Sequence, residues 1–169
     1  AWWSPVLSIP NDKWQEGGQM SSPVLIERTL PHSIMVNKAG KRFCNEATNY
    51  SALAGAFHFF DPNQYGYPNL PAWIIFDSNF KDKYPFSTIM PGVDAPNWMN
   101  SADTLNQLAE KLDININNFT ETIHNFNNYV DEGNDREFSR GESDYDSFYG
   151  DRSQEGVFST LGKLNKGPY

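Results

Sequence analysis

The stretch from Ser33 to Tyr50, which reads SIMVNKAGKRFCNEATNY, constrains the fold of this chain more than any other. Residues 33–37 are apolar and partly β-branched, which favours a β-strand, and residues 38–41 form a polar turn that contains one glycine. Residues 42–45 can then pair back as a second strand. The stretch therefore predicts a β-hairpin over residues 33–45.

The segment after this hairpin places polar side chains at a strand-to-helix junction. Small residues from Ser51 to His58 favour a helix. The turn before them holds Asn45 and Glu46, and Tyr50 stands where the helix begins. Because the first turn of a helix has free backbone N–H groups, we expect these three side chains to converge there on a ligand.

The composition bounds the class of protein. At 169 residues the chain fits one domain with a core of its own, and its aromatic content of 15% supplies both core volume and flat surfaces for a ligand. A formal net charge of -8 argues against a nucleic-acid partner, which would need clustered lysine and arginine. Cys44 is the single cysteine, so we expect a small buried hydrophobic residue rather than a disulfide or a zinc ligand. No metal site is predicted.

Membrane and export signals are not recognisable in the sequence. No run approaches the roughly 20 apolar residues of a membrane span. The first residues lack the basic-then-apolar pattern of a signal peptide. The default prediction is a cytoplasmic protein without a membrane span.

Residues 1–32 form a loop-rich lead-in according to their composition. They hold Trp2, Trp3 and Trp14, four prolines and a Gly-Gly pair, which punctuate regular structure. We expect loops with one short strand at 23–28. Since tryptophans in a leading loop need a surface to pack against, we expect the protein to begin further upstream and this chain to be an excised domain.

A central strand and an irregular region follow the first helix. Residues 72–76, AWIIF, are a continuous apolar run suited to a buried strand. Asp77 and Ser78 can cap a short helix at 79–83. Three prolines within 84–100 predict an irregular segment, which we interpret as a lid or substrate-side loop.

Two amphipathic helices are predicted next. The first covers 101–112, with the capping-box pair Thr104 and Gln107 near its start, and the second covers about 117–130 and ends at Gly133. Their apolar stripes recur at steps of three and four residues: Leu105, Leu108, Ala109 and Leu112, then Ile116, Phe119, Ile123, Phe126 and Val130. The two helices should form a hairpin on a small antiparallel or mixed sheet, which makes the fold class α+β.

The C-terminal region is strongly acidic. Residues 131–156 contain few aliphatic side chains and predict an exposed loop, in which Tyr145 and Tyr149 either rim a pocket or anchor the loop. The end of the chain, 161–169, resembles the start of another strand. Arg28 and Arg42 are expected on the surface or between domains.

Five motifs in a fixed order make the chain resemble a known family. They are GKRFCNE, PAWIIFD, ADTLNQLAEKLDI, the long segment from NFTETIHNFNNY to FSRGESDYDSFYGD, and the closing KGPY. Together they resemble the cap (catalytic) domain of the fumarate reductase and 3-ketosteroid dehydrogenase flavoprotein superfamily, over nearly the whole chain. The segment FSRGESDYDSFYGD and the closing KGPY look most similar to the 3-ketosteroid Δ1-dehydrogenase branch.

The resemblance implies a two-domain, FAD-dependent enzyme in which a cap is inserted into a Rossmann-type FAD domain and closes over the flavin. Residues 1–169 would be the single cap domain. The chain itself contains no G-x-G-x-x-G turn after a strand, so we expect FAD in the full-length enzyme and not on this domain alone, which should be inactive. The implied partners are the FAD-binding domain of the same chain and a small hydrophobic ketone.

Site residues follow from the same resemblance. The family has a tyrosine near the substrate after the Asn-Glu pair, so Tyr50 would remove a proton beside a ketone while the flavin takes a hydride. Asn45 and Glu46 would hold the edge of the flavin or substrate, and Glu46 could relay protons. We expect all three on an open apolar face. The alternatives are that Tyr50 packs on the core and that Glu46 only favours a helix N-terminus.

Three functions are then open. The resemblance favours dehydrogenation of a 3-ketosteroid or a similar fused-ring ketone. A fumarate or other enoate reductase is the alternative within the superfamily, but fumarate reductases carry an arginine about one turn after the glutamate, where this chain has Asn49 and Tyr50. A non-catalytic acidic domain that binds a partner through its aromatic residues is the alternative from another class.

Overall fold

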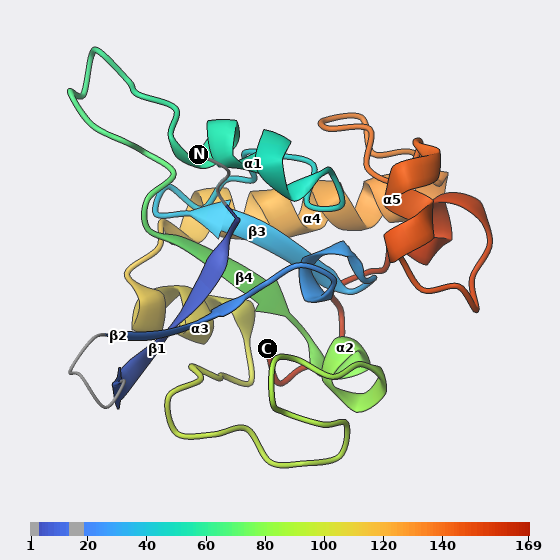
Figure 1. Cartoon of the computed structure of the whole chain (residues 1–169), viewed down its shortest axis with the longest axis horizontal. Coiled ribbons are helices and arrows are strands. Elements are labelled where there is room, and N and C mark those ends of the chain that lie inside the picture. The colour runs from blue at the N-terminus through green and yellow to red at the C-terminus, as the bar shows by residue number, and fades with distance from the viewer. Residues whose placement is uncertain (1–3, 14–18) are drawn as a thin grey trace.

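The computed structural model describes residues 4–13 and 19–169, and it confirms an α+β fold (Figure 1). Predictions that fall on Trp2, Trp3, Trp14 and the pair Gly17-Gly18 lie outside the described residues. The described strands are β1 (Val6–Lys13), β2 (Gln19–Pro23), β3 (Ser33–Asn37) and β4 (Ala72–Phe76). The helices are α1 (Tyr50–Phe57), α2 (Ser78–Lys83), α3 (Leu105–Leu112), α4 (Ile116–Glu132) and α5 (Asp144–Tyr149), with short 3-10 helices η1 (Glu27–Thr29) and η2 (Gly156–Ser159).

β3 and β4 form the central antiparallel pair and match along their whole length. The predicted turn after β3 is present, since the Asn37 carbonyl oxygen accepts the Gly40 N–H at 2.9 Å. The prediction that residues 42–45 form the second strand of a hairpin is wrong. The Arg42 side chain is buried and binds two buried carboxylates, so the chain turns inward there, and the wholly buried β3 takes the apolar β4 as its partner.

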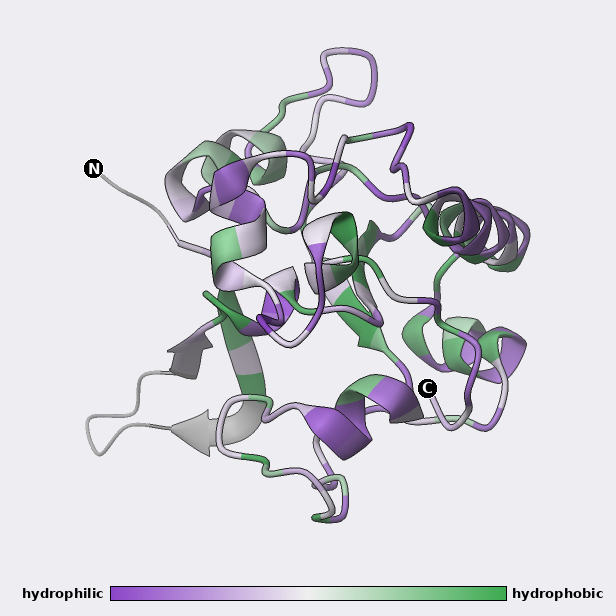
Figure 2. Cartoon of the chain, turned by 90° about the vertical axis from the view of Figure 1, so that its right-hand side faces the viewer, coloured by the Kyte–Doolittle hydropathy of each residue, from purple (hydrophilic) through white to green (hydrophobic). Residues whose placement is uncertain are grey.

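The β3–β4 sheet is covered on both faces. On one face, Ile34, Val36 and Ile75 pack against α3 and α4, whose buried residues in this cluster are Leu108, Ala109, Phe119, Ile123, Phe126 and Val130. The predicted helical hairpin on the sheet is thereby confirmed. The other face packs against Leu53 of α1 and against Cys44, the buried hydrophobic residue that was predicted. Figure 2 shows the hydrophobic strands at the centre of the molecule.

The helix ends follow the side chains that cap them. α3 begins later than the predicted position 101, because Thr104 Oγ1 accepts the Gln107 N–H and Gln107 Oε1 accepts the Thr104 N–H. α4 ends at Gly133, whose φ of 65° suits glycine. The Asp77 carboxylate caps α2, as predicted.

The lead-in is more regular than its composition predicts. β1 and β2 form an antiparallel ribbon with an irregular register in its middle. The predicted strand at 23–28 is therefore wrong, and η1 occupies part of that range. A two-stranded ribbon has free edges, so it can accommodate prolines, which lack an N–H. Residues 84–100, in contrast, are irregular as predicted, with one isolated bridge between Phe86 and Ile89.

The acidic region 131–156 is mostly exposed, as its charge predicts, but it is not a simple loop. It contains α5, and Asp135, Arg140 and Asp146 are each at most 2% exposed. Their charges are paired or hydrogen-bonded inside the protein. The end of the chain forms no strand either, and its two leucines are buried in the core with α3 and α4.

The turn at Gly40 lies close to the backbone at the start of α4. Gly40 has a φ of +75°, and a Cβ placed there would lie 2.7 Å from the Asn115 carbonyl oxygen and 2.7 Å from the Phe119 nitrogen. Gly92 has a φ of +78° with open space around it. We expect Gly40→Ala to lower the free energy of unfolding by at least about 1 kcal/mol more than Gly92→Ala, because only Gly40 adds a clash with backbone to the cost of a positive φ. Urea unfolding of both variants measures the difference, and equal losses would contradict the close approach.

Candidate active site

A cluster of buried charges includes one residue of the predicted site, Glu46. Arg42 Nη2 donates to Glu46 Oε2 and to Asp135 Oδ2, each at 2.8 Å. Arg140 Nη1 donates to Glu46 Oε2 at 3.1 Å. These side chains are at most 1% exposed. We call Arg42, Glu46, Asp135 and Arg140 the buried ion cluster.

Glu46 is held within this cluster. Both of its carboxylate oxygens accept hydrogen bonds from Arg42, and Oε1 also accepts the Met35 N–H at 3.1 Å. Burial by itself raises the pKa of Glu46, but Arg42 and Arg140 outweigh burial and hold this pKa at about 2. Glu46 is 0% exposed, so the prediction that it shares an open face with the other two site residues is wrong. Its predicted role as a ligand of flavin or substrate has no support in this geometry.

Asn45 connects the turn before α1 to α5. Its Oδ1 accepts the Ala47 N–H at 2.8 Å, and its Nδ2 donates to Asp146 Oδ2 at 2.8 Å. Asp146 Oδ2 also accepts the Gly141 N–H at 3.0 Å. Asn45 is half-buried, and both ends of its amide are engaged. It therefore serves to fix the turn that leads into α1.

Tyr50 is the first residue of α1 and is 42% exposed. Asn49 caps the helix, because its Oδ1 accepts the Ser51 N–H at 2.8 Å. A side chain in the first turn of a helix leans toward the N-terminus, where the helix dipole favours negative charge. Tyr50 is thus not packed in the core, and its phenol is accessible to a ligand at the positive end of α1.

Three segments meet at the turn before α1, and we call them the α1–α5 corner: Ile26–Thr29, Asn45–Tyr50 and Asp144–Tyr149. They are joined by hydrogen bonds, among them one from Thr29 Oγ1 to the Tyr149 carbonyl oxygen at 2.6 Å. The large apolar side chains that these segments expose are Ile26, Tyr50, Tyr145, Phe148 and Tyr149. The corner therefore exposes apolar and aromatic side chains on the same three segments that carry the accessible phenol.

Several residues that build the buried ion cluster and this corner were missed from the sequence. Arg28 and Arg42 were predicted on the surface or between domains, which is wrong, since the whole residues, backbone included, are 2% and 7% exposed. Asp135, Arg140 and Asp146 fell within the predicted acidic loop. The one available signal was the mixture of acidic and basic residues there, but such a mixture is also typical of a solvated segment.

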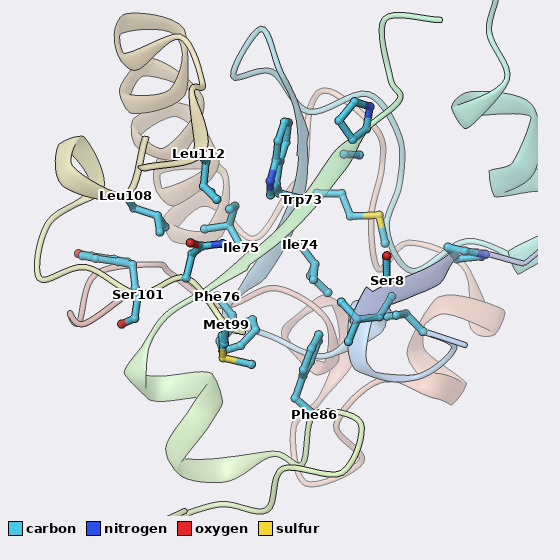
Figure 3. Close-up of a pocket in the computed structure, with 18 of the residues that line it drawn as sticks. Ser8, Trp73, Ile74, Ile75, Phe76, Phe86, Met99, Ser101, Leu108 and Leu112 are labelled. Carbon is cyan, nitrogen blue, oxygen red and sulfur yellow. The ribbon is translucent and has the colours of Figure 1, made fainter. Parts of the chain in front are cut away.

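A separate apolar groove of about 930 Å³ runs along β4 (Figure 3). Its lining includes Trp73, Ile74, Ile75 and Phe76 of β4 and Leu108 and Leu112 of α3. The residues of α1 that reach it are Ala54 and Phe57, with His58 just after the helix, and Tyr50 is not among the lining residues. The groove therefore borders the later part of α1, and the corner surrounds its start. Because the accessible phenol lies in the corner, we assign the candidate chemistry to the corner.

The described residues do not fit the dinucleotide part of FAD. A pyrophosphate site needs a glycine-rich turn between a strand and a helix, with free N–H groups. Side chains of Asn49, Thr104 and Asn115 cap the starts of α1, α3 and α4, and none of these starts is glycine-rich. Within residues 4–13 and 19–169, no group of three or more His, Cys, Asp or Glu side chains could hold a metal ion. No helix in the same ranges has the length and apolar character needed to cross a membrane.

Comparison with known proteins finds similar dehydrogenases. The chain is 39% identical over 180 residues to a 3-oxosteroid 1-dehydrogenase of Mycolicibacterium smegmatis, an alignment that covers 100% of this chain and 30% of that protein. It is 34% identical over 169 residues to a 4-oxocyclohexanecarboxylate 2-dehydrogenase of Sinomonas cyclohexanicum, covering 100% of this chain and 29% of that protein. No family model matches the chain.

Solved structures agree with these relatives. The 3-ketosteroid delta1-dehydrogenase from Sterolibacterium denitrificans, in complex with 1,4-androstadiene-3,17-dione, matches with a TM-score of 0.85 and 31% identity over 99% of this chain and 30% of that one. A flavocytochrome c3 fumarate reductase in its open conformation matches with a TM-score of 0.55 and 23% identity over 81% of this chain and 21% of that one, which shows the fold alone. The chain thus spans about 30% of the length of the dehydrogenases it matches. Sequence and fold thus confirm the resemblance seen in the five motifs: over its whole described length the chain is similar to one part of the 3-ketosteroid dehydrogenases.

Proposed function

We propose that this chain is the substrate-capping domain of an FAD-dependent oxidoreductase that dehydrogenates a 3-ketosteroid or a similar fused-ring ketone. The observation that carries the proposal is the accessible phenol of Tyr50 at the start of α1, within an apolar and aromatic corner. The names of the relatives support it, because they are dehydrogenases of ketones that lie on a ring.

The proposed reaction breaks two C–H bonds and forms one C=C bond. Tyr50 first gives its own proton to solvent, and its phenolate oxygen then takes the proton from the carbon adjacent to the ketone, where the carbonyl group makes the C–H bond acidic. The electron pair of that bond forms the double bond while the next carbon loses a hydride. FAD supplies the hydride acceptor when bound, and residues outside this chain would hold its dinucleotide part.

The remaining residues of the corner would bind and orient the substrate. Ile26, Tyr145 and Tyr149 offer apolar surface that favours a rigid hydrophobic ring system over water. The positive end of α1 would favour negative charge on the Tyr50 oxygen by roughly 0.3–1 kcal/mol. Asn45 would act through the turn that it fixes, because both ends of its amide are already engaged.

The proposed partner is an FAD-binding domain of the same longer protein. An open groove of about 930 Å³ lined mainly by apolar side chains is unusual on a soluble monomer, so we propose that this domain covers the groove as well as the corner. The 169-residue chain alone should then hold no stoichiometric FAD and show no dehydrogenase activity. Flavin absorbance after purification and a steroid assay would check both points.

Reduction of fumarate is less well supported by this geometry. A dicarboxylate needs accessible cations, but Arg28, Arg42 and Arg140 of this region are buried. Arg152 is exposed, and its guanidinium is stacked on the Phe148 ring. Asn49 and Tyr50 also occupy the place of the arginine that fumarate reductases carry. The corner therefore suits an apolar ketone better than a dicarboxylate.

The substrate class can be tested with the full-length enzyme. Androstenedione and 4-oxocyclohexanecarboxylate would each be offered with an artificial electron acceptor, and fumarate with reduced viologen. We expect turnover of androstenedione to exceed turnover of the single-ring acid, and no reduction of fumarate. Failure to turn over any steroid would overturn the proposed substrate class, and turnover of the single-ring acid alone would replace it.

A further inference from the structure

Arg28 is a buried cation that binds backbone oxygens. It is 2% exposed, and its Nη1 donates to the carbonyl oxygens of Glu46 and Thr48, the latter at 2.8 Å. Its Nε is buried and has no hydrogen-bond partner within the described part of the chain. Arg42 and Arg140, in contrast, both form ion pairs with Glu46. Arg28 therefore differs from Arg42 and Arg140 in its partners, which are backbone carbonyl oxygens rather than a carboxylate.

This arrangement has an energetic cost. A guanidinium taken out of water without a paired carboxylate loses hydration that neutral acceptors only partly replace, and burial lowers the pKa of Arg28. Neutral side chains already satisfy N–H groups of the same turn, since Asn45 binds the Ala47 N–H and Asn49 binds the Ser51 N–H. The short side chains of Asn45 and Asn49 do not bind the carbonyl oxygens of Glu46 and Thr48. The longer side chain of Arg28 reaches these oxygens from η1. Despite this desolvation cost, Arg28 fixes the direction of the turn at residues 46–48.

The two carbonyl groups that Arg28 binds belong to the segment that carries Tyr50. Thr48 lies two residues before Tyr50, and Asn49 between them is the N-cap of α1. Leu53 is the fully buried residue of α1, and Ala56 and Phe57 pack half-buried against the same cluster, so core packing holds the later turns of the helix rather than its start. The position of the Tyr50 phenol therefore depends on the turn that Arg28 fixes more than on packing of the helix.

We infer that Arg28 is a positioning residue for Tyr50: it clamps the carbonyl oxygens of Glu46 and Thr48 and thereby holds the phenol where it accepts the substrate proton. The inference rests on the proposed function. Arginine suits this role because its planar group of donors fixes the directions of two acceptors, whereas the ammonium group of lysine is a single point charge.

The test compares Arg28→Met and Arg28→Lys in the full-length enzyme with ketosteroid as substrate. Misplacement of a reacting group by about 1 Å can cost about 100-fold in rate, so we expect Arg28→Met to lower kcat at least about 10-fold with KM changed less than about threefold. Arg28→Lys should recover part of the loss. The matched control is Arg136→Met, because Arg136 is 64% exposed and pairs with Glu132 on the surface; its kcat should stay within about twofold of wild type.

A double variant separates positioning from general damage to the structure. If Arg28 acts through Tyr50, adding Arg28→Met to Tyr50→Phe should cost less than about twofold further, since the group being positioned is already gone. A full additional loss in the double variant would overturn the inference, as would a normal kcat in Arg28→Met beside a slow Tyr50→Phe. Unchanged turnover in Tyr50→Phe would instead refute the proposed role of Tyr50. Should Arg28→Met fail to fold, Arg28→Lys takes its place beside Arg136→Met and in the double variant, and a kcat within about twofold of wild type would then overturn the inference.

Discussion

Replacing Tyr50 with phenylalanine in the full-length enzyme is expected to lower kcat at least about 100-fold, because the ring is kept and only the hydroxyl that accepts the proton is lost. The KM for ketosteroid and the FAD content should change less than about threefold, since Tyr50 is 42% exposed and its hydroxyl is not needed to pack α1. Anaerobic single-turnover reduction of the flavin is the measurement of choice. It isolates the removal of proton and hydride from reoxidation of the enzyme.

The matched control for this variant is Tyr65→Phe. Tyr65 lies in the loop after α1, is 86% exposed and loses the same hydroxyl. Its rate should stay within about twofold of wild type, as is usual for exposed positions away from a site. A Tyr50→Phe enzyme with unchanged flavin reduction would remove Tyr50 from the mechanism and leave the family and the fold.

Glu46→Gln is expected to lower the free energy of unfolding by roughly 3–5 kcal/mol, the range seen when one partner of a buried ion pair is removed. Glutamine has nearly the same size, so packing changes little. Its amide is neutral, however, so the two buried arginines of the cluster, Arg42 and Arg140, keep Asp135 as its one buried carboxylate. Urea unfolding of the 169-residue chain, followed by tryptophan fluorescence, measures the loss.

The exposed pair between Glu132 and Arg136 provides the control. It has the same i,i+4 spacing as the pair between Glu46 and Arg42, and its atoms are also 2.8 Å apart, but its side chains are 42% and 64% exposed. Glu132→Gln should therefore change the free energy of unfolding by less than about 1 kcal/mol. Similar losses in the two variants would show that burial of the ion cluster does not determine its contribution.

The loss in Glu46→Gln should also depend on pH with a definite sign. Folding lowers the pKa of Glu46 from its ordinary value of 4.5 to about 2. The stabilisation by its charged form is fully present above the higher of these values and is lost as the pH falls through the lower one. The difference in stability between wild type and Glu46→Gln should therefore shrink between about pH 5 and pH 2. A difference that stays constant over this range would contradict a charged Glu46.

Elements with strong signals of their own were predictable. The apolar run of β4 is buried or half-buried, and the capping pair Thr104 and Gln107 stands at the start of α3. Gly133 ends α4 as expected from its freedom to adopt a positive φ. The place of Tyr50 at a helix start was predicted in the same way, from the small residues that follow it. Its role in catalysis stays a prediction.

The pairing of β3 with β4 and the burial of the charged side chains in the ion cluster depended on contacts between distant segments. β3 pairs with β4 across the intervening α1, although a nearer segment offered a hairpin. Arg42 reaches Asp135 across 93 residues, and Arg140 reaches Glu46 across 94. A charged side chain is tolerated in a core only when opposite charges and hydrogen-bond partners arrive there with it. Hydrophobic periodicity within one element carries no information about that encounter, so local patterns assigned these residues to the surface, and only the folded chain shows them at its centre.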